Sequence, residues 1–215
     1  MKNWDMIGRK NYEAIAFSPQ QWFKLADHLL QSAKLLKPRA ARARDSMSEH
    51  FKDRSIRPKL DHYTATYLML TSYAIENLLK GELVNRNAIS LRADPGFLKK
   101  GKLPAKLCTH NLLELADELK LEFDVEAQAT LLRLQRSAIW NGRYPVPLDY
   151  KATDNKQNHR GRDFFIGYLV LSDLDYLPVL VADIRRQLDI RVLPSEFRKK
   201  RLKSSYNRKR LKGHR

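Results

Sequence analysis

The longest regular pattern of apolar positions lies between Leu60 and Asn87 and has the spacing of an α-helix. One stripe is widened by further apolar residues on its flank, so that much of the circumference is apolar: Tyr63, Tyr67, Leu70, Ala74, Asn77 and Leu78, with Leu68, Ile75, Leu79 and Leu83. A helix that is apolar on most of its faces is buried. The pattern therefore predicts a central helix around which the other elements pack.

Before this helix, Ser18 and Pro19 form a typical helix start, with a serine N-cap and a proline in the first turn. The apolar stripe that follows runs to Leu36, and Pro38 is expected to end the helix. Residues 1–17 are weakly patterned and are expected to form an arm. The basic region 39–59 is predicted to be broken up, with one short helix at 45–52.

After the central helix, residues 88–107 are expected to form a long loop. A helix over 112–121 is predicted next, with Thr109 or Asn111 as its cap, and Asp124 is expected to cap another helix that ends near Trp140. Its Arg133 and Arg136 are placed on the more polar side.

In the last part of the chain, residues 150–162 are polar and are expected to form an exposed loop. Ser172 is expected to start a final helix that reaches Leu188 and has Pro178 near its first turn. No strand-type alternation with hairpin turns is evident. The prediction is an all-α protein: an up-and-down bundle of four to five principal helices in one domain, residues 1–193, followed by a basic disordered tail, residues 194–215.

The composition of the chain excludes several classes of protein and of site. A single cysteine, Cys108, excludes an internal disulfide and fits a reducing compartment. The start of the chain has no apolar core of a signal peptide, and no apolar run reaches the roughly twenty residues that span a bilayer. A soluble, cytoplasmic protein is expected. No motif for a metal or a cofactor is present, and none is predicted.

Charge points to a class of partner. The chain has 41 Lys and Arg against 24 Asp and Glu, a net charge of +17, and residues 194–215 hold ten basic residues and one acidic. A flexible basic arm can neutralise phosphates, so nucleic acid is the predicted partner and a membrane is not. The tail residues expected to bind nucleic acid are Arg198, Lys199, Lys200, Arg201, Arg208, Lys209 and Arg210.

The segment from Trp140 to Pro147, W-N-G-R-Y-P-V-P, is expected to end a helix. Gly142 is conformationally free, and the two prolines have no backbone N–H with which to continue the helix. Arg143 would stand at the helix end, with Tyr144 beside it. One interpretation is an arginine that complements the helix dipole. The other is a guanidinium that is presented to a phosphate.

Within the central helix, Glu76 and Lys80 are spaced i,i+4 in the order that favours an ion pair. Two interpretations are open: a salt bridge on the helix surface, worth a few tenths of a kcal/mol, or a pair near a functional site.

Three segments together resemble the HEPN family of small helical domains: Y-A-I-E-N-L-L-K-G from Tyr73, T-H-N-L-L-E-L-A from Thr109, and W-N-G-R-Y-P-V-P from Trp140. Their order and approximate spacing agree with that family from about Leu60 to Leu188.

The resemblance implies a helical bundle that commonly forms homodimers. It also implies a metal-independent endoribonuclease of a toxin–antitoxin or other defence system, with an antitoxin protein as a candidate partner. Arg143 would match the active-site arginine, Glu76 and Lys80 the pair of the early helix, and His110 the non-catalytic His-x-Leu position.

The sequence departs from the family where a histidine is expected with four to six residues between it and the arginine. Those positions hold Leu148, Asp149 and Tyr150, and the next histidine is His159. RNA cleavage needs a base for the ribose 2′-hydroxyl and a cation for the phosphate. Arg143 can supply the cation; the substitutes for the base are Tyr150, Asp149 and His159.

Two functions are therefore predicted. The first is a dimeric HEPN-like ribonuclease, with Arg143, Tyr144, Tyr150 and Glu76 as catalytic residues. The second is a non-catalytic module that binds nucleic acid through Lys80, the basic region 34–59 and the tail. A third class of function is protein interaction alone, in which the basic tail docks on an acidic partner protein.

Overall fold

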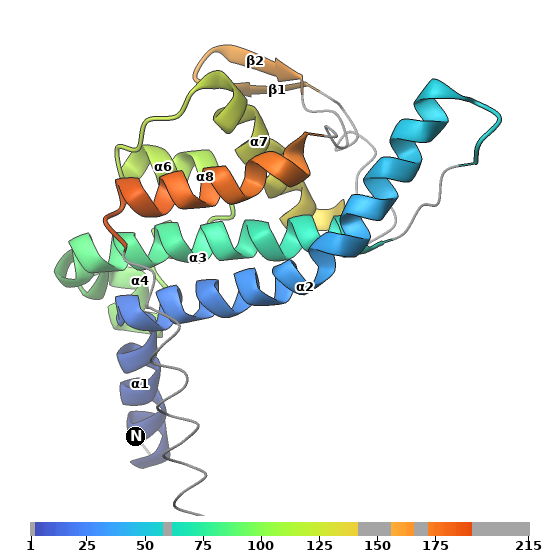
Figure 1. Ribbon diagram of the computed structural model, residues 1–215. Helices are drawn as coiled ribbons and strands as arrows, with labels where there is room; N and C mark the ends of the chain where they lie inside the picture. The colour runs from blue at the N-terminus through green and yellow to red at the C-terminus, as the bar shows by residue number, and fades with distance from the viewer. Residues whose placement is uncertain (1–2, 58–61, 142–155, 166–171, 191–215) are drawn as a thin grey trace, which may run out of the picture.

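The computed structural model describes residues 3–57, 62–141, 156–165 and 172–190. These residues are mostly helical, which confirms the all-α class. Helix α3 (Tyr63–Arg92) is the central element, as the apolar pattern predicts, and it contacts α2 (Pro19–Lys52), α6 (Leu112–Glu118), α7 (Val125–Arg136) and α8 (Asp173–Gln187). Figure 1 shows α2 on one side of α3 and α6 and α8 on the other.

The first helices are longer than predicted. Residues expected to form an arm are helical in α1 (Asn3–Ala16), and α2 continues through Pro38 to Lys52. The prediction that Pro38 ends the helix is therefore wrong, as is the broken region with a separate helix at 45–52. Pro38 lacks an N–H and removes one backbone hydrogen bond. Because Ala33 and Ala40 on either side of it are buried, packing maintains the helix across the proline.

Small residues set the distance between α2 and α3. Ala26, Ala33 and Ala40 recur every seven residues along α2 and are almost fully buried. On α3, Gly81 lies so close to α2 that an added Cβ would be 2.6 Å from Cε1 of Phe23 and 3.0 Å from Cβ of Trp22. Glycine at this position therefore permits the close approach of the two helices.

The region predicted as a loop, 88–107, is partly helical. Helix α3 extends to Arg92 with a kink at Asn87, and two short helices follow, α4 (Pro95–Lys100) and α5 (Ala105–Cys108). The side chain of Asp94 accepts hydrogen bonds from the N–H groups of Gly96 and Phe97 and so caps α4. A local cap of this kind stabilises a helix too short to form alone.

Two of the predicted caps are confirmed. Asn111, one of the two residues predicted as cap, accepts a hydrogen bond from the N–H of Glu114 at the start of α6, and Asp124 accepts one from the N–H of Ala127 at the start of α7. Ser18 lies at the N-cap of α2 but its hydroxyl donates to Gln20 Oε1. The serine therefore marks the helix start without capping it by its side chain.

Helix α8 begins after Ser172, as predicted, and a buried ion pair joins it to α7. Arg133 donates two hydrogen bonds to the carboxylate of Asp173, from Nε at 2.8 Å and from Nη2 at 2.7 Å. Both side chains are buried, with exposed fractions of 7% and 3%. The expectation that Arg133 lies on a polar side of its helix is therefore wrong, because α8 covers it.

A short hairpin is the exception to the helical architecture. Strand β1 (Lys156–His159) pairs antiparallel with β2 (Arg162–Phe165), with His159 opposite Arg162. The two loop residues, Arg160 and Gly161, have φ angles of 51° and 76°. Two consecutive left-handed residues are typical of a tight hairpin turn. The prediction of no hairpin is wrong, and so is that of a loop at residues 156–162, although most of these residues are exposed, as predicted.

Candidate functional site

Glu76 and Lys80 form the predicted ion pair, and the pair is buried. Nζ of Lys80 donates to Oε1 of Glu76 at 2.6 Å, and the exposed fractions of the side chains are 5% and 7%. Of the two interpretations, the surface salt bridge is therefore excluded. Removing two charges from water is unfavourable unless both are well partnered. An ion pair buried in the core of a helical protein is therefore unusual.

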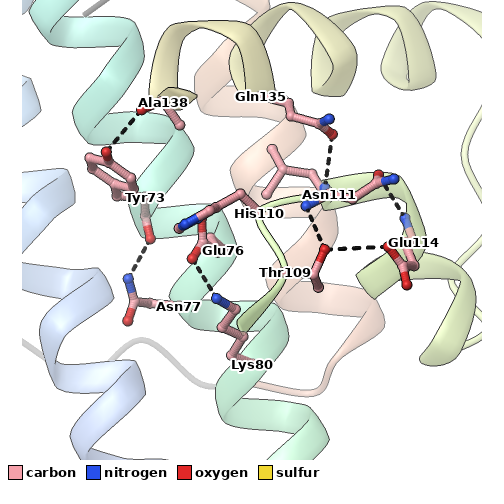
Figure 2. A network of polar contacts seen from close by, with 11 residues as sticks. Tyr73, Glu76, Asn77, Lys80, Thr109, His110, Asn111, Glu114, Gln135 and Ala138 are labelled. Carbon is pink, nitrogen blue, oxygen red and sulfur yellow. Dashed lines mark hydrogen bonds and ion pairs between the residues drawn. The ribbon is translucent and has the colours of Figure 1, made fainter. Parts of the chain in front are cut away.

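His110 contacts the other oxygen of the same carboxylate. Its Nδ1 lies 2.9 Å from Oε2 of Glu76, although the two residues are 34 positions apart. The imidazole is half-exposed, with 52% of the side chain accessible to solvent. Among the described residues, each carboxylate oxygen of Glu76 thus has one side-chain partner: Lys80 within the protein and His110 at the surface. Figure 2 shows the three side chains converging at α3.

The loop that carries His110 is fixed by a set of hydrogen bonds. Thr109 Oγ1 accepts from the N–H of Asn111 at 3.1 Å, and the Asn111 side chain in turn caps α6. From α7, Gln135 Oε1 accepts from the N–H of Leu112 at 3.2 Å. These bonds surround His110 on both sides in the chain (Figure 2). The histidine is therefore held on a braced segment between α5 and α6.

The end of α7 lies beside the same part of α3. The helix passes into a π-helix at Ser137–Asn141, and the hydroxyl of Tyr73 donates to the carbonyl oxygen of Ala138 at 2.9 Å. Tyr73 precedes Glu76 by one helical turn (Figure 2). Short π-helical segments are frequent at functional sites. This one ends two residues before Arg143.

Several residues predicted for the site lie outside the described residues. They are Arg143, Tyr144, Asp149 and Tyr150, together with every predicted residue of the tail, Arg198, Lys199, Lys200, Arg201, Arg208, Lys209 and Arg210. Of the predicted site, the structure describes Glu76 and Lys80. It adds His110, which the resemblance placed at a non-catalytic position.

His159, a candidate substitute for the missing histidine, has a different partner. Its Nε2 lies 3.2 Å from Oδ2 of Asp117 at the end of α6, and Arg160 pairs with the same carboxylate at 2.9 Å. A cavity of about 360 Å³ lies here, lined by Asp117, His159, Arg160 and Arg162 among others. Of these two histidines, His110 contacts Glu76 and His159 contacts Asp117.

The chemistry of the cluster follows from its hydrogen bonds. A carboxylate only accepts hydrogen bonds, so the contact with Glu76 requires a proton on Nδ1 of His110. In the neutral imidazole, the other nitrogen, Nε2, is then an acceptor. Among the described residues, Nε2 makes no hydrogen bond. Nε2 of His110 is therefore available at the surface to accept a proton.

A signal for the His110 contact exists in the sequence, since the segments quoted for the resemblance contain Glu76, Lys80 and His110 in this order. Their convergence on one carboxylate depends on the packing of α6 against α3 and is not visible in either segment alone. Within the described parts of the chain, no group of three His, Cys, Asp or Glu side chains is arranged to hold a metal ion, and no helix has the length and apolar character needed to cross a membrane.

In comparisons with models of protein families, with curated proteins and with solved structures, no match to this chain was found.

Proposed function

We propose that the chain is a HEPN-like helical bundle that cleaves RNA without a metal ion. One observation carries the proposal: a buried Glu76–Lys80 pair is joined to the half-exposed His110 beside the helix end that leads toward Arg143. A buried charged pair is costly to maintain, and this one is hydrogen-bonded to a histidine in contact with solvent. The contact joins the buried pair to a side chain that a substrate can reach from solvent.

The proposal assigns the remaining parts of the reaction to residues beyond the π-helix. Arg143 stabilises the negative charge that develops on the phosphate, and Tyr144 and Tyr150 contribute to the same site. The net charge of +17 favours binding of the polyanionic substrate. A homodimer, an antitoxin protein as partner and a cytoplasmic location belong to the same proposal.

The experiment that tests this function is incubation of the full-length protein with mixed cellular RNA in EDTA. The parent protein should cleave RNA, and Arg143→Ala should lose cleavage while its circular dichroism and thermal unfolding are unchanged. Arg186→Ala is the matched control, because Arg186 is an exposed arginine on α8, paired only with Asp183 among the described residues. If Arg143→Ala cleaves at the rate of the parent, the assigned role of Arg143 is wrong; if the parent is inactive, the ribonuclease proposal is wrong.

A second candidate is a non-catalytic module that binds nucleic acid. It is favoured by exposed cations along α2, of which Lys34, Arg42 and Lys52 form no ion pair with another described residue. Unpaired cations along one long helix suit the regularly spaced phosphates of a nucleic-acid strand. Retention of RNA on a gel without cleavage, weakened by Lys34→Glu and Arg42→Glu, would favour this candidate.

A further inference from the structure

We infer that His110 is the general base of the reaction and that Glu76 is the residue that positions it. This inference rests on the ribonuclease function proposed above and supplies the part that the sequence lacks, a base in place of the missing motif histidine. It starts from one contact, the 2.9 Å hydrogen bond between Nδ1 of His110 and Oε2 of Glu76.

The contact selects the imidazole tautomer in which Nε2 can accept a proton. Glu76 accepts the proton-bearing Nδ1, so that Nε2 carries the lone pair and points away from the carboxylate. A carboxylate that holds a histidine in this tautomer also stabilises the imidazolium formed when Nε2 takes a proton. The half-exposed position of the ring leaves Nε2 accessible to a substrate from solvent.

Lys80 keeps the carboxylate available for this task. A buried carboxylate needs a compensating positive charge and filled hydrogen-bonding positions. The ammonium group of Lys80 supplies both at Oε1, at 2.6 Å, and leaves Oε2 for the histidine. The positive charge of Lys80 is itself buried, and its role is to support Glu76 from within the protein.

The backbone around His110 gives the precision that a base requires. The hydrogen bonds of Thr109, Asn111 and Gln135 fix the segment on both sides of the histidine. A ring held at Nδ1 by α3 and at its backbone by α6 and α7 has little freedom to turn away. Such preorganisation increases the efficiency of proton transfer.

The chemical step is transesterification of a ribonucleotide. Nε2 of His110 takes the proton of the ribose 2′-hydroxyl, and the 2′-oxygen forms a bond to the adjacent phosphorus. The bond from phosphorus to the 5′-oxygen of the next nucleotide breaks, and that oxygen leaves with a proton from water. His110 then returns its proton to solvent. The products are a 2′,3′-cyclic phosphate and a 5′-hydroxyl end, and the step consumes no oxidant, reductant or metal.

The decisive variant is His110→Asn in the full-length protein. The Asn side-chain amide can still donate to Glu76 but has no group that accepts a proton at neutral pH. Single-turnover cleavage in EDTA should slow by about 100-fold or more, which is the usual contribution of a general base. His28→Asn is the matched control, since His28 is an exposed histidine on α2 with no side-chain partner among the described residues, and it should cleave like the parent.

Two further readouts separate a base from a structural histidine. Cleavage by His110→Ala should recover when imidazole is added, because the truncated side chain leaves space at the surface. Glu76→Gln should lower kcat less than His110→Asn does and leave KM unchanged, because the histidine is still present.

The outcomes are distinct. An inactive parent overturns both the ribonuclease function and the role of His110. An active parent with an equally active His110→Asn variant overturns only the role of His110. Products with a 3′-hydroxyl end, or cleavage of an RNA whose 2′-positions are methylated, would show that the 2′-hydroxyl does not attack and would also overturn the inference.

Discussion

The carboxylate of Glu76 in the middle of α3 is hydrogen-bonded to the ring of His110, which precedes α6, at 2.9 Å. The same carboxylate is paired with Lys80, one helical turn further on, at 2.6 Å. One buried acidic group thus links the centre of the core to a side chain in contact with solvent. Both the stability of the fold and the proposed reaction depend on it.

Lys80→Met should lower the free energy of unfolding by about 3–5 kcal/mol, because it leaves the buried carboxylate of Glu76 without its cation. Urea denaturation followed by circular dichroism measures the change. The double variant Glu76→Gln with Lys80→Met should lose less than Lys80→Met alone, since no charge is then buried. Lys106→Met is the control: its pair with Glu118 is exposed and should contribute less than about 1 kcal/mol. A small effect of Lys80→Met would contradict the burial of the pair.

Gly81→Ala should lower the free energy of unfolding by about 1 kcal/mol or more, even though alanine is the better helix former. The new Cβ would lie 2.6 Å from Phe23 Cε1 and 3.0 Å from Trp22 Cβ, so α2 and α3 must separate slightly. Gly8→Ala is the comparison, since a Cβ added there meets no atom within 4 Å. That variant should leave the stability unchanged or raise it. Equal behaviour of the two variants would contradict the close approach of α2 and α3.

Removal of residues 194–215 should weaken RNA binding and reduce its dependence on salt. The segment holds ten basic residues, and each phosphate contact that is lost reduces the slope of log K against log salt by about 0.7 for a single strand. Fluorescence anisotropy at several salt concentrations measures the slope. Cleavage at saturating protein concentration should persist, because Glu76 and His110 are retained. An unchanged slope would show that residues 194–215 do not contact the RNA.

Asp183 should contribute a pH-dependent part of the stability. Hydrogen bonds from Arg186 and Gln187 lower the pKa of Asp183 in the folded protein. A depressed pKa stabilises the fold above the unfolded value of about 3.9, and this stabilisation is lost as the pH falls through the folded pKa. In urea unfolding between pH 7 and pH 3, Asp183→Asn should therefore lose less stability than the parent. An identical pH dependence of the two proteins would contradict the shift.

Local signals predicted much of the fold. The caps Asn111 and Asp124 and the buried stripe of α3 are properties of short segments, and the structure confirms them. The course of α2 was not predictable in this way. A proline interrupts a helix by local rules, but here the burial of Ala40 beyond Pro38 outweighs the lost hydrogen bond.

The hairpin was missed because its strands carry few apolar residues and its turn is Arg160–Gly161 rather than an asparagine–glycine pair. For the site, the spacing of Glu76 and Lys80 predicted their ion pair but not its burial. The contact of Glu76 with His110 joins residues 34 positions apart, and only the packing of α6 on α3 brings them together.

The fit of Gly81 against Phe23 has a consequence for how the sequence can change. Gly81 directly follows Lys80, so the closest approach of α2 and α3 lies next to the buried ion pair. A larger side chain at position 81 would be tolerated only with a smaller one at position 23. Across natural variants of this chain the two positions should therefore change together, and this covariation should be strongest where Glu76 and Lys80 are both kept.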